Sequence, residues 1–178
     1  KEIDYIISNA KNNLKKAKVS FLPKDSHKYV NTNVRTNRSF WMDKCSDKIT
    51  SNLCKRIARE IDCDWKHFEN YQVINYKPGE EYKYHFDAYN KKDLEKYQHF
   101  CGERGNRLKT VLVYLNTVEE GGETGFSKLG KKVKAVKGRI VVFNNVKTNG
   151  DIYERSLHAG LPVIKGEKWA FNLWLREK

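Results

Sequence analysis

His85 and Asp87 stand one residue apart in the run from Tyr82 to Asp87. On an extended strand, side chains two residues apart point to the same face, so an imidazole and a carboxylate would lie side by side. Such a pair supplies two thirds of a metal site. The third ligand has to come from elsewhere. Of the five histidines in the chain, we expect it to be His158, because of the residues that follow it.

His85, Asp87 and His158 together form a two-histidine, one-carboxylate set. This set is typical of non-haem Fe(II), and it leaves coordination positions open for a co-substrate and dioxygen. An isolated His-x-Asp pair is common by chance, and most such pairs make structural hydrogen bonds. Lys168 strengthens the metal interpretation, because it lies ten residues after His158 and could meet a dicarboxylic acid inside the fold. Taken alone, Lys168 would be interpreted as an ordinary surface lysine.

Short β-rich runs carry these residues from position 71 onward. Pro78-Gly79, Gly121-Gly122, Gly138 and Gly150 separate the runs, and this punctuation is typical of a sandwich or jelly roll. The predicted strands are Tyr71–Tyr76, Tyr82–Asp87, Leu108–Asn116, Lys132–Val136, Arg139–Asn144, Ser156–His158 and Lys168–Leu175.

Residue parity assigns faces to two of these strands. The odd positions of 169–175 and of 111–115 are large and apolar, which predicts a packed face. The opposite faces carry Lys168, Trp174 and Thr110. These polar faces could line a cavity or meet solvent.

Two amphipathic helices precede the strands, at residues 2–17 and 46–61, with Ser46 as the predicted N-cap of the second. The polar stretch 23–38 between them predicts a loop or irregular strand. We therefore expect an α+β fold that is mainly β, in a single domain over residues 1–178. Residues 1–66 would form a helical support region, and residues 67–178 a jelly-roll core.

The net charge of +13 allows two interpretations. Lysines are scattered through every segment, so a solvated basic surface is favoured over nucleic-acid binding. No apolar run approaches the ~20 residues of a membrane span, so we expect none. The chain begins with Lys1, which indicates a trimmed N-terminus, so the compartment stays open between the endoplasmic reticulum or secretory route and a viral-host setting.

Four cysteines, Cys45, Cys54, Cys63 and Cys101, form no CxxC pair, and a structural zinc site is not favoured. They could form two disulfides in an oxidising compartment or act as small buried hydrophobes in a reducing one. We expect at least one disulfide by a narrow margin.

The chain resembles the catalytic domain of the collagen-type prolyl 4-hydroxylases, which are Fe(II)/2-oxoglutarate dioxygenases. Beyond the His85-x-Asp87 pair, His158 and Lys168, the resemblance extends over nearly the whole chain. It rests on Arg35-Thr-Asn37, Tyr71-Gln-Val-Ile-Asn-Tyr76, Pro78-Gly79, Arg107-Leu-Lys-Thr110, Val-Tyr-Leu-Asn116, Val118-Glu-Glu-Gly-Gly-Glu-Thr124, Ser156-Leu-His-Ala-Gly-Leu-Pro-Val163 and Gly166-Glu-Lys-Trp169.

The resemblance implies a double-stranded β-helix with iron held by His85, Asp87 and His158. Lys168 would bind the distal carboxylate of 2-oxoglutarate, with Tyr76 and Thr110 as hydrogen-bonding partners. The family residues that face the peptide correspond to Arg107, Trp174 and Tyr82. Tyr82 has the opposite parity to His85, so a regular strand would turn it away and a bulge or bend is required.

The implied reaction is hydroxylation of peptidyl proline at C4 with release of succinate and CO2, using Fe(II), 2-oxoglutarate, O2 and, by resemblance, ascorbate. Lysine rather than arginine at position 168 favours the collagen-type enzymes, so a collagen-like or other Pro-rich polypeptide is the first choice. The alternatives are a prolyl hydroxylase acting on one folded regulatory or translation protein, and a non-catalytic peptide- or nucleic-acid-binding module. The size matches the small plant, algal and viral enzymes and implies a monomer.

The charged segment Ala88–Asn106 separates Asp87 from Arg107 and contains Gly102 and Gly105. A long loop beside an active site is often a lid that closes over substrate. A disordered insertion is the equally weighted alternative.

Overall fold

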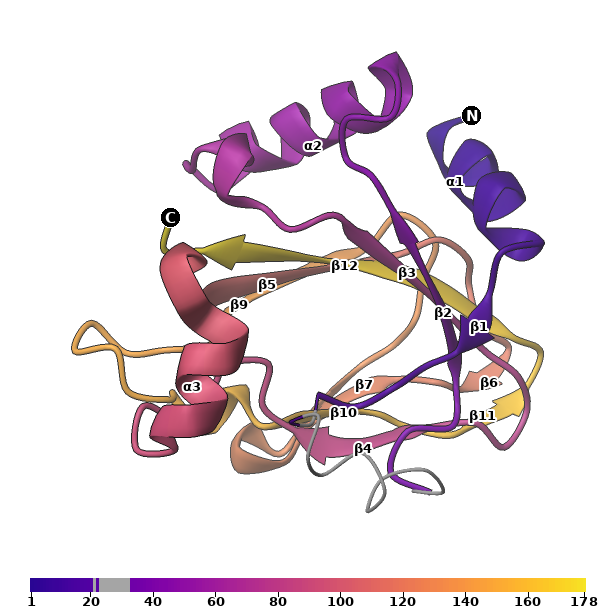
Figure 1. The fold of residues 1–178 in the computed structure, drawn as a ribbon. Helices are drawn as coiled ribbons and strands as arrows, with labels where there is room; N and C mark the ends of the chain where they lie inside the picture. The colour runs from indigo at the N-terminus through magenta and orange to yellow at the C-terminus, as the bar shows by residue number, and fades with distance from the viewer. Residues whose placement is uncertain (21, 23–32) are drawn as a thin grey trace.

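The computed structural model describes residues 1–20, 22 and 33–178 (Figure 1). Its helices and strands are α1 (Glu2–Lys11), β1 (Lys15–Lys16), β2 (Arg38–Met42), α2 (Lys48–Glu60), β3 (Tyr71–Tyr76), β4 (Tyr82–His85), α3 (Leu94–Cys101), β5 (Arg107–Tyr114), β6 (Glu120–Gly121), β7 (Thr124–Phe126), β8 (Lys131–Val133), β9 (Ile140–Asn144), β10 (His158–Gly160), β11 (Val163–Lys165) and β12 (Lys168–Arg176).

Two antiparallel sheets form the body of the fold. The larger has six strands in the order β1-β2-β3-β12-β5-β9, and the smaller has four in the order β4-β10-β7-β8. A two-stranded β11-β6 ribbon continues at one side, and the two main sheets face each other across the interior (Figure 1). Crossovers between non-consecutive strands give the predicted jelly-roll arrangement.

The two N-terminal helices cover the outer face of the larger sheet (Figure 1). Ile6 of α1 and Ile57 of α2 belong to one buried cluster with Trp169, Phe171 and Leu173 from the odd positions of β12. Val111, Val113 and Leu115 join the same cluster from the odd positions around β5. The predicted packed faces of both strands are therefore confirmed.

The other faces of the same strands turn inward, between the two sheets. Tyr76, Leu112, Tyr114 and Ala170 form a second buried cluster there. Lys168 and Trp174 line the large cavity of the molecule. The sequence left open whether the polar face of β12 lines a cavity or meets solvent. In the structure this face lines a cavity.

The first helix is shorter than predicted, because α1 ends at Lys11 and not at residue 17. Asn12 is the C-cap, and the backbone N–H of Asn13 donates to the Ala10 carbonyl to close the last turn. Asparagine has low helix propensity, and the chain then gains more from pairing Lys15 and Lys16 with β2 than from another helical turn.

The second helix begins one residue later than predicted. Asp47, not Ser46, is its N-cap, and its Oδ1 accepts hydrogen bonds from the Ile49 and Thr50 amides. The Thr50 hydroxyl in turn accepts a hydrogen bond from the Asp47 amide, which completes a capping box. An ionised carboxylate also suits the positive end of the helix, and these contacts lower the pKa of Asp47 to about 2.

The support region contributes strands as well as helices. β1 and β2 add two strands to the larger sheet, and Arg38 belongs to β2 instead of ending the predicted loop at 23–38. Most of that loop lies outside the described residues.

The segment 88–106 is ordered and contains α3, so the disordered-insertion alternative is wrong. The Asn106 side chain accepts a bond from the Tyr89 amide and donates one to the Tyr89 carbonyl, which ties the two ends of the segment together. The Tyr89 ring also stacks on Phe100 at 4.9 Å between ring centroids.

All four cysteines are free, so the expected disulfide is wrong. Cys54 is a small buried residue of the helix-side core, where burial raises its pKa to about 11, and Cys101 is buried at the end of α3. Their positions correspond to the buried-hydrophobe alternative. Among the described residues, the helices are too short and too polar to cross a bilayer.

Candidate metal centre

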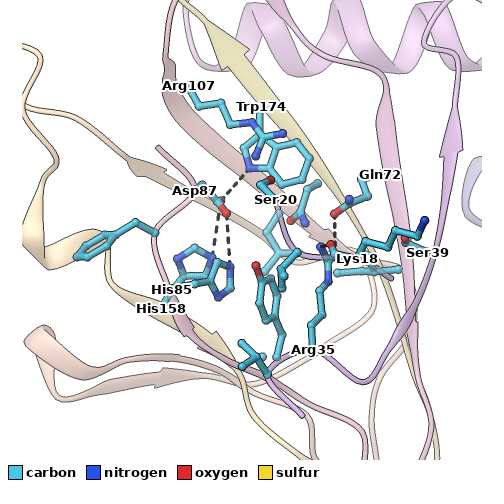
Figure 2. A pocket seen from close by; sticks show the side chains of 18 of the residues that line it. Lys18, Ser20, Arg35, Ser39, Gln72, His85, Asp87, Arg107, His158 and Trp174 are labelled. Carbon is cyan, nitrogen blue, oxygen red and sulfur yellow. Dashed lines mark hydrogen bonds and ion pairs between the residues drawn. The ribbon is translucent and has the colours of Figure 1, made fainter. Parts of the chain in front are cut away.

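The three predicted metal ligands meet between the sheets. His85 ends β4, Asp87 follows in the next loop, and His158 opens β10, directly opposite His85 in the antiparallel pair. One ligand atom from each lies within 4.8 Å of the other two, and within the described ranges this is the one cluster of its kind. Figure 2 shows both imidazoles directed at the Asp87 carboxylate.

Backbone hydrogen bonds fix the tautomer of both histidines. His85 Nδ1 donates to the Lys83 carbonyl at 2.7 Å, and His158 Nδ1 donates to the Ser156 carbonyl at 2.8 Å. Each ring therefore keeps its Nε2 lone pair for a metal. Such a bond on the far nitrogen is the usual arrangement for a metal-binding histidine.

Two side chains orient the carboxylate of Asp87. Its Oδ2 accepts a hydrogen bond from Thr110 Oγ1 at 2.6 Å. It accepts another from the indole nitrogen of Trp174 at 2.8 Å (Figure 2). Asn145 Nδ2 donates to the Thr110 hydroxyl, so the hydroxyl hydrogen is directed at Asp87. The free Oδ1 lies 3.5 Å from His85 Nε2 and is available as a single ligand atom.

The protonation states also suit a cation. Burial opposes ionisation of Asp87, but the neighbouring histidines and Arg107 outweigh it and hold the pKa of its carboxyl well below the ordinary range. Burial lowers the pKa of His158 to about 4, against the attraction of Asp87. At neutral pH the site therefore presents a carboxylate and neutral imidazole, the forms that bind metal. Two nitrogens and one oxygen on one side of a site fit Fe(II).

Lys168 lies in the same cavity and is almost completely buried, with 1% of its surface exposed. Its ammonium lies over the ring of Tyr76 at 5.1 Å and over that of Tyr114 at 5.4 Å from the ring centroids. In the described part of the chain no carboxylate forms an ion pair with it, and burial lowers its pKa to about 7. A buried cation without a counter-charge is costly, so the position favours an anionic ligand.

The bulge required for Tyr82 is present. In the β4–β10 pair His158 is opposite His85, but Gly160 is opposite Tyr82, so β4 holds one extra residue between them. Tyr82 therefore faces the same side as His85, and the two rings stack with centroids 3.6 Å apart. Gly160 makes room for this side of the site, because a Cβ there would lie 3.0 Å from the Tyr76 hydroxyl.

Arg107 is held by a buried carboxylate that the sequence analysis did not identify. Glu69 accepts from Arg107 Nε at 2.6 Å and from its NH2 nitrogen at 2.9 Å, and it also accepts from Arg176 at 2.7 Å. The guanidinium of Arg107 then lies 3.7 Å from the ring centroid of Trp174. Arg107 thus stacks on the indole that donates to Asp87.

The cavity around these groups has a volume of about 1150 Å³. Eight of the nine predicted site residues line it: His85, Asp87, His158, Lys168, Tyr76, Arg107, Trp174 and Tyr82. Thr110 is absent from the lining and contacts Asp87, so the structure places it behind this carboxylate and not beside Lys168. Sequence reasoning missed Glu69, Tyr114 and Arg35. Of these three, only Tyr114 could have been found from the sequence, because it lies on the same strand face as Thr110.

The comparisons with known proteins agree with this geometry. The sequence model described as 2OG-Fe(II) oxygenase superfamily matches residues 71–176. The probable prolyl 4-hydroxylase 7 of Arabidopsis thaliana is 33% identical over 196 residues, which cover 99% of this chain and 59% of the plant protein. The putative prolyl 4-hydroxylase of Acanthamoeba polyphaga mimivirus is 33% identical over 147 residues, which cover 82% of this chain and 60% of the viral protein. This chain thus spans less than two thirds of the length of these relatives.

Among solved structures, a viral collagen prolyl hydroxylase from Paramecium bursaria Chlorella virus-1, in complex with 2OG, has the same fold. The TM-score is 0.73 at 28% identity, with 98% of this chain and 89% of the viral chain covered.

Proposed function

The chain belongs to the 2OG-Fe(II) oxygenase superfamily, and from this premise we propose that it is a prolyl 4-hydroxylase that uses Fe(II) and 2-oxoglutarate. The observation that carries the proposal is the opening of His85, Asp87, His158 and Lys168 into one cavity. The first three residues would hold the metal. Lys168 would pair with the distal carboxylate of 2-oxoglutarate.

The residues of the chain bind and orient, while the bound groups supply the oxidation. When bound, Fe(II) and 2-oxoglutarate supply dioxygen chemistry that hydroxylates an unactivated C–H bond and releases succinate and CO2. Trp174 and Thr110 keep Asp87 directed at the metal position through their bonds to Oδ2. No side chain has to act as a general base. Ascorbate as a reductant and a monomeric state remain predictions.

Aromatic side chains support a proline-rich peptide as the substrate. Trp41, Tyr82, Tyr89 and Trp174 line the cavity beside the metal ligands. The ring of Trp41 is half exposed and lies 5.7 Å from that of Trp174. Proline-rich chains adopt extended polyproline II, a shape that aromatic-lined grooves bind. We propose a collagen-like or other Pro-rich polypeptide hydroxylated at proline C4.

A peptide panel tests the proposal. Proline repeats, Gly-X-Pro repeats and folded proteins are incubated with Fe(II), 2-oxoglutarate and air, and each product is examined for the mass gain of one oxygen. We expect hydroxylation of proline in the extended peptides, with succinate formed in proportion. If the metal-loaded protein adds oxygen to none of the substrates, the proposal is contradicted. If only folded proteins are hydroxylated, the proposed Pro-rich peptide substrate is wrong.

A further inference from the structure

The large cavity continues beyond the metal ligands to the segment that follows β1. Lys15, Lys16 and Lys18 line this part, together with Arg35 (Figure 2 shows Lys18 and Arg35). The segment is fastened to the cavity wall, because the Arg35 NH1 nitrogen donates to the Lys18 carbonyl and Ser20 hydrogen-bonds to the Tyr89 hydroxyl at 2.9 Å. A peptide that leaves the metal site in this direction passes these cations.

Arg35 is a buried cation whose partners among the described residues are neutral. It is 8% exposed, and its side chain donates to Asn37 Oδ1, Gln72 Oε1 and the Lys18 carbonyl. A guanidinium has five N–H donors, and its bonds to the described residues use three of them. Its carbon lies 4.5 Å from the ring centroid of Tyr82, which in turn stacks on His85. A buried guanidinium that meets no carboxylate in the described part of the chain favours an anionic ligand close to the reaction centre.

Lysines line the cavity from two separate parts of the fold. Lys96 lines it from α3, which lies at the left of the barrel in Figure 1, whereas β1 with Lys15 and Lys16 lies at the right. Lys15, Lys16, Lys18 and Lys96 form no side-chain ion pair within the part of the chain that the structure describes. Three of these lysine side chains are exposed and Lys96 is half-buried.

The described residues give the cavity little negative charge. Among them, the carboxylates that line it are Asp87 and Asp93. Asp93 is the N-cap of α3 and accepts a hydrogen bond from the Lys96 amide. Bound Fe(II) and 2-oxoglutarate would not neutralise the remaining cations, because the charges of the metal and Lys168 balance those of Asp87 and the 2-oxoglutarate dianion. The excess positive charge is left to the substrate.

We propose that the substrate of this site is an acidic peptide, in which aspartate or glutamate side chains flank the target proline. The proposal rests on the proposed prolyl hydroxylase function and adds the charge of its substrate. Arg35 would bind a carboxylate near the target proline, and the lysines would attract carboxylates farther along the peptide. Complementary charge accelerates encounter and selects partners, and the effect weakens as salt increases.

Three labelled peptides test the proposal. They share one proline-containing core and carry glutamate, glutamine or lysine flanks. Their Kd is measured by fluorescence anisotropy under nitrogen, with Fe(II) and 2-oxoglutarate bound, and their hydroxylation is measured separately in air. We expect the glutamate peptide to bind about tenfold or more tightly than the glutamine peptide, with the lysine peptide weakest. The difference should shrink strongly between about 50 and 300 mM salt.

Two charge-reversal variants separate position from net charge. The first changes Lys15, Lys16 and Lys18 to Glu, and the control changes Lys128, Lys132 and Lys134, which are exposed and lie outside the cavity lining. Both remove the same charge. The first should lose the preference for the glutamate peptide, and the control should keep most of it. Arg35→Gln should weaken binding of the glutamate peptide while it leaves the glutamine peptide nearly unchanged.

The outcomes distinguish the substrate charge from the activity. Equal binding and equal hydroxylation of all three peptides would overturn the acidic preference and leave the hydroxylase function standing. Tight binding of the glutamate peptide without oxygen gain in any peptide would support the preference for acidic peptides and contradict the prolyl hydroxylase activity. A single-stranded RNA that displaces the glutamate peptide at lower concentration would show that the basic surface serves nucleic acid and would overturn the proposal.

Discussion

Replacing Lys168 by methionine should stabilise the protein while it weakens 2-oxoglutarate binding. The pKa of Lys168 falls to about 7 because burial disfavours its charge. From an ordinary value near 10.4, at about 1.4 kcal/mol for each pKa unit, the upper bound for the cost of the charged form is about 5 kcal/mol. Relaxation and water entry reduce this cost, so we expect the Lys168→Met variant to gain about 1 to 3 kcal/mol in free energy of unfolding.

The gain should depend on pH in a defined direction. Below about pH 7 the lysine is charged in both folded and unfolded chains, and the full cost is present. As the pH rises from about 7 toward 10.4, the folded protein holds the neutral amine and the unfolded chain still holds the proton, so the wild type becomes more stable. The advantage of Lys168→Met should therefore be largest below pH 7 and vanish near pH 10.

Urea unfolding at pH 6 and pH 9.5 measures the stability, and calorimetry with 2-oxoglutarate under nitrogen measures the binding. Exposed Lys128→Met serves as the control and should change neither. At one fixed concentration, 2-oxoglutarate should stabilise the wild type more than Lys168→Met, because only the wild type offers a partner for the distal carboxylate. A Lys168→Met protein that is no more stable at pH 6, or that binds 2-oxoglutarate as tightly as the wild type, would refute the reasoning.

Four further predictions follow from the contacts. Asp87→Ala should abolish turnover, and it should also abolish Co(II) binding as measured by visible absorbance. Normal turnover in this variant would contradict the assignment of Asp87 as a metal ligand. Trp174→Phe removes the indole donor to Asp87, so metal affinity should fall about tenfold or more. An unchanged affinity would show that Thr110 alone is enough to orient Asp87. Glu69→Gln leaves two buried guanidinium groups without their carboxylate and should cost about 3 kcal/mol in urea unfolding, whereas a loss below about 1 kcal/mol would contradict a structural ion pair. Protease cutting within residues 88–106 should slow when 2-oxoglutarate and peptide are bound, and unchanged cutting would count against a lid.

The candidate metal ligands could be predicted because their signal is local. β4 ends at His85 and not, as predicted, at Asp87, but the two residues are close in sequence and their side chains still meet, with 3.5 Å between His85 Nε2 and Asp87 Oδ1. Lys168 lies on the inward face of a strand whose other face is uniformly apolar. The longer strands were found for the same reason: β3 has the predicted bounds, and β12 and β5 differ by one or two residues at their ends. In these strands, the alternation of residue types along the sequence indicates which side chains face the core.

The parts that sequence reasoning missed depend on contacts between distant segments. β1 has two residues and exists because Lys15 and Lys16 pair with β2. No local pattern predicts that Glu69, which precedes β3, meets Arg176 of β12 and Arg107 of β5, because these pairs form only when the three strands lie side by side in the sheet. Parity placed Thr110 on the polar face of its strand, and the resemblance assigned it to the pocket of Lys168, but in the structure its hydroxyl donates to Asp87.

The Tyr82 side chain shows the limit of parity most clearly. A regular strand would have turned it away from His85, and one extra residue in β4 reverses that result. A bulge changes which side of the sheet a residue faces, and its presence depends on the pairing with β10.

The most direct test of the proposed activity is the stoichiometry of succinate and hydroxyproline in one reaction. The protein is supplied with Fe(II), 2-oxoglutarate, air and a proline-rich peptide, and both products are quantified by mass spectrometry with the hydroxyl position assigned by fragmentation and comparison with authentic 4-hydroxyproline. The account predicts one succinate for each peptidyl 4-hydroxyproline, and loss of both products in Asp87→Ala. Succinate formation without any hydroxylated proline, or neither product from a metal-loaded protein with any peptide of the panel, would contradict it.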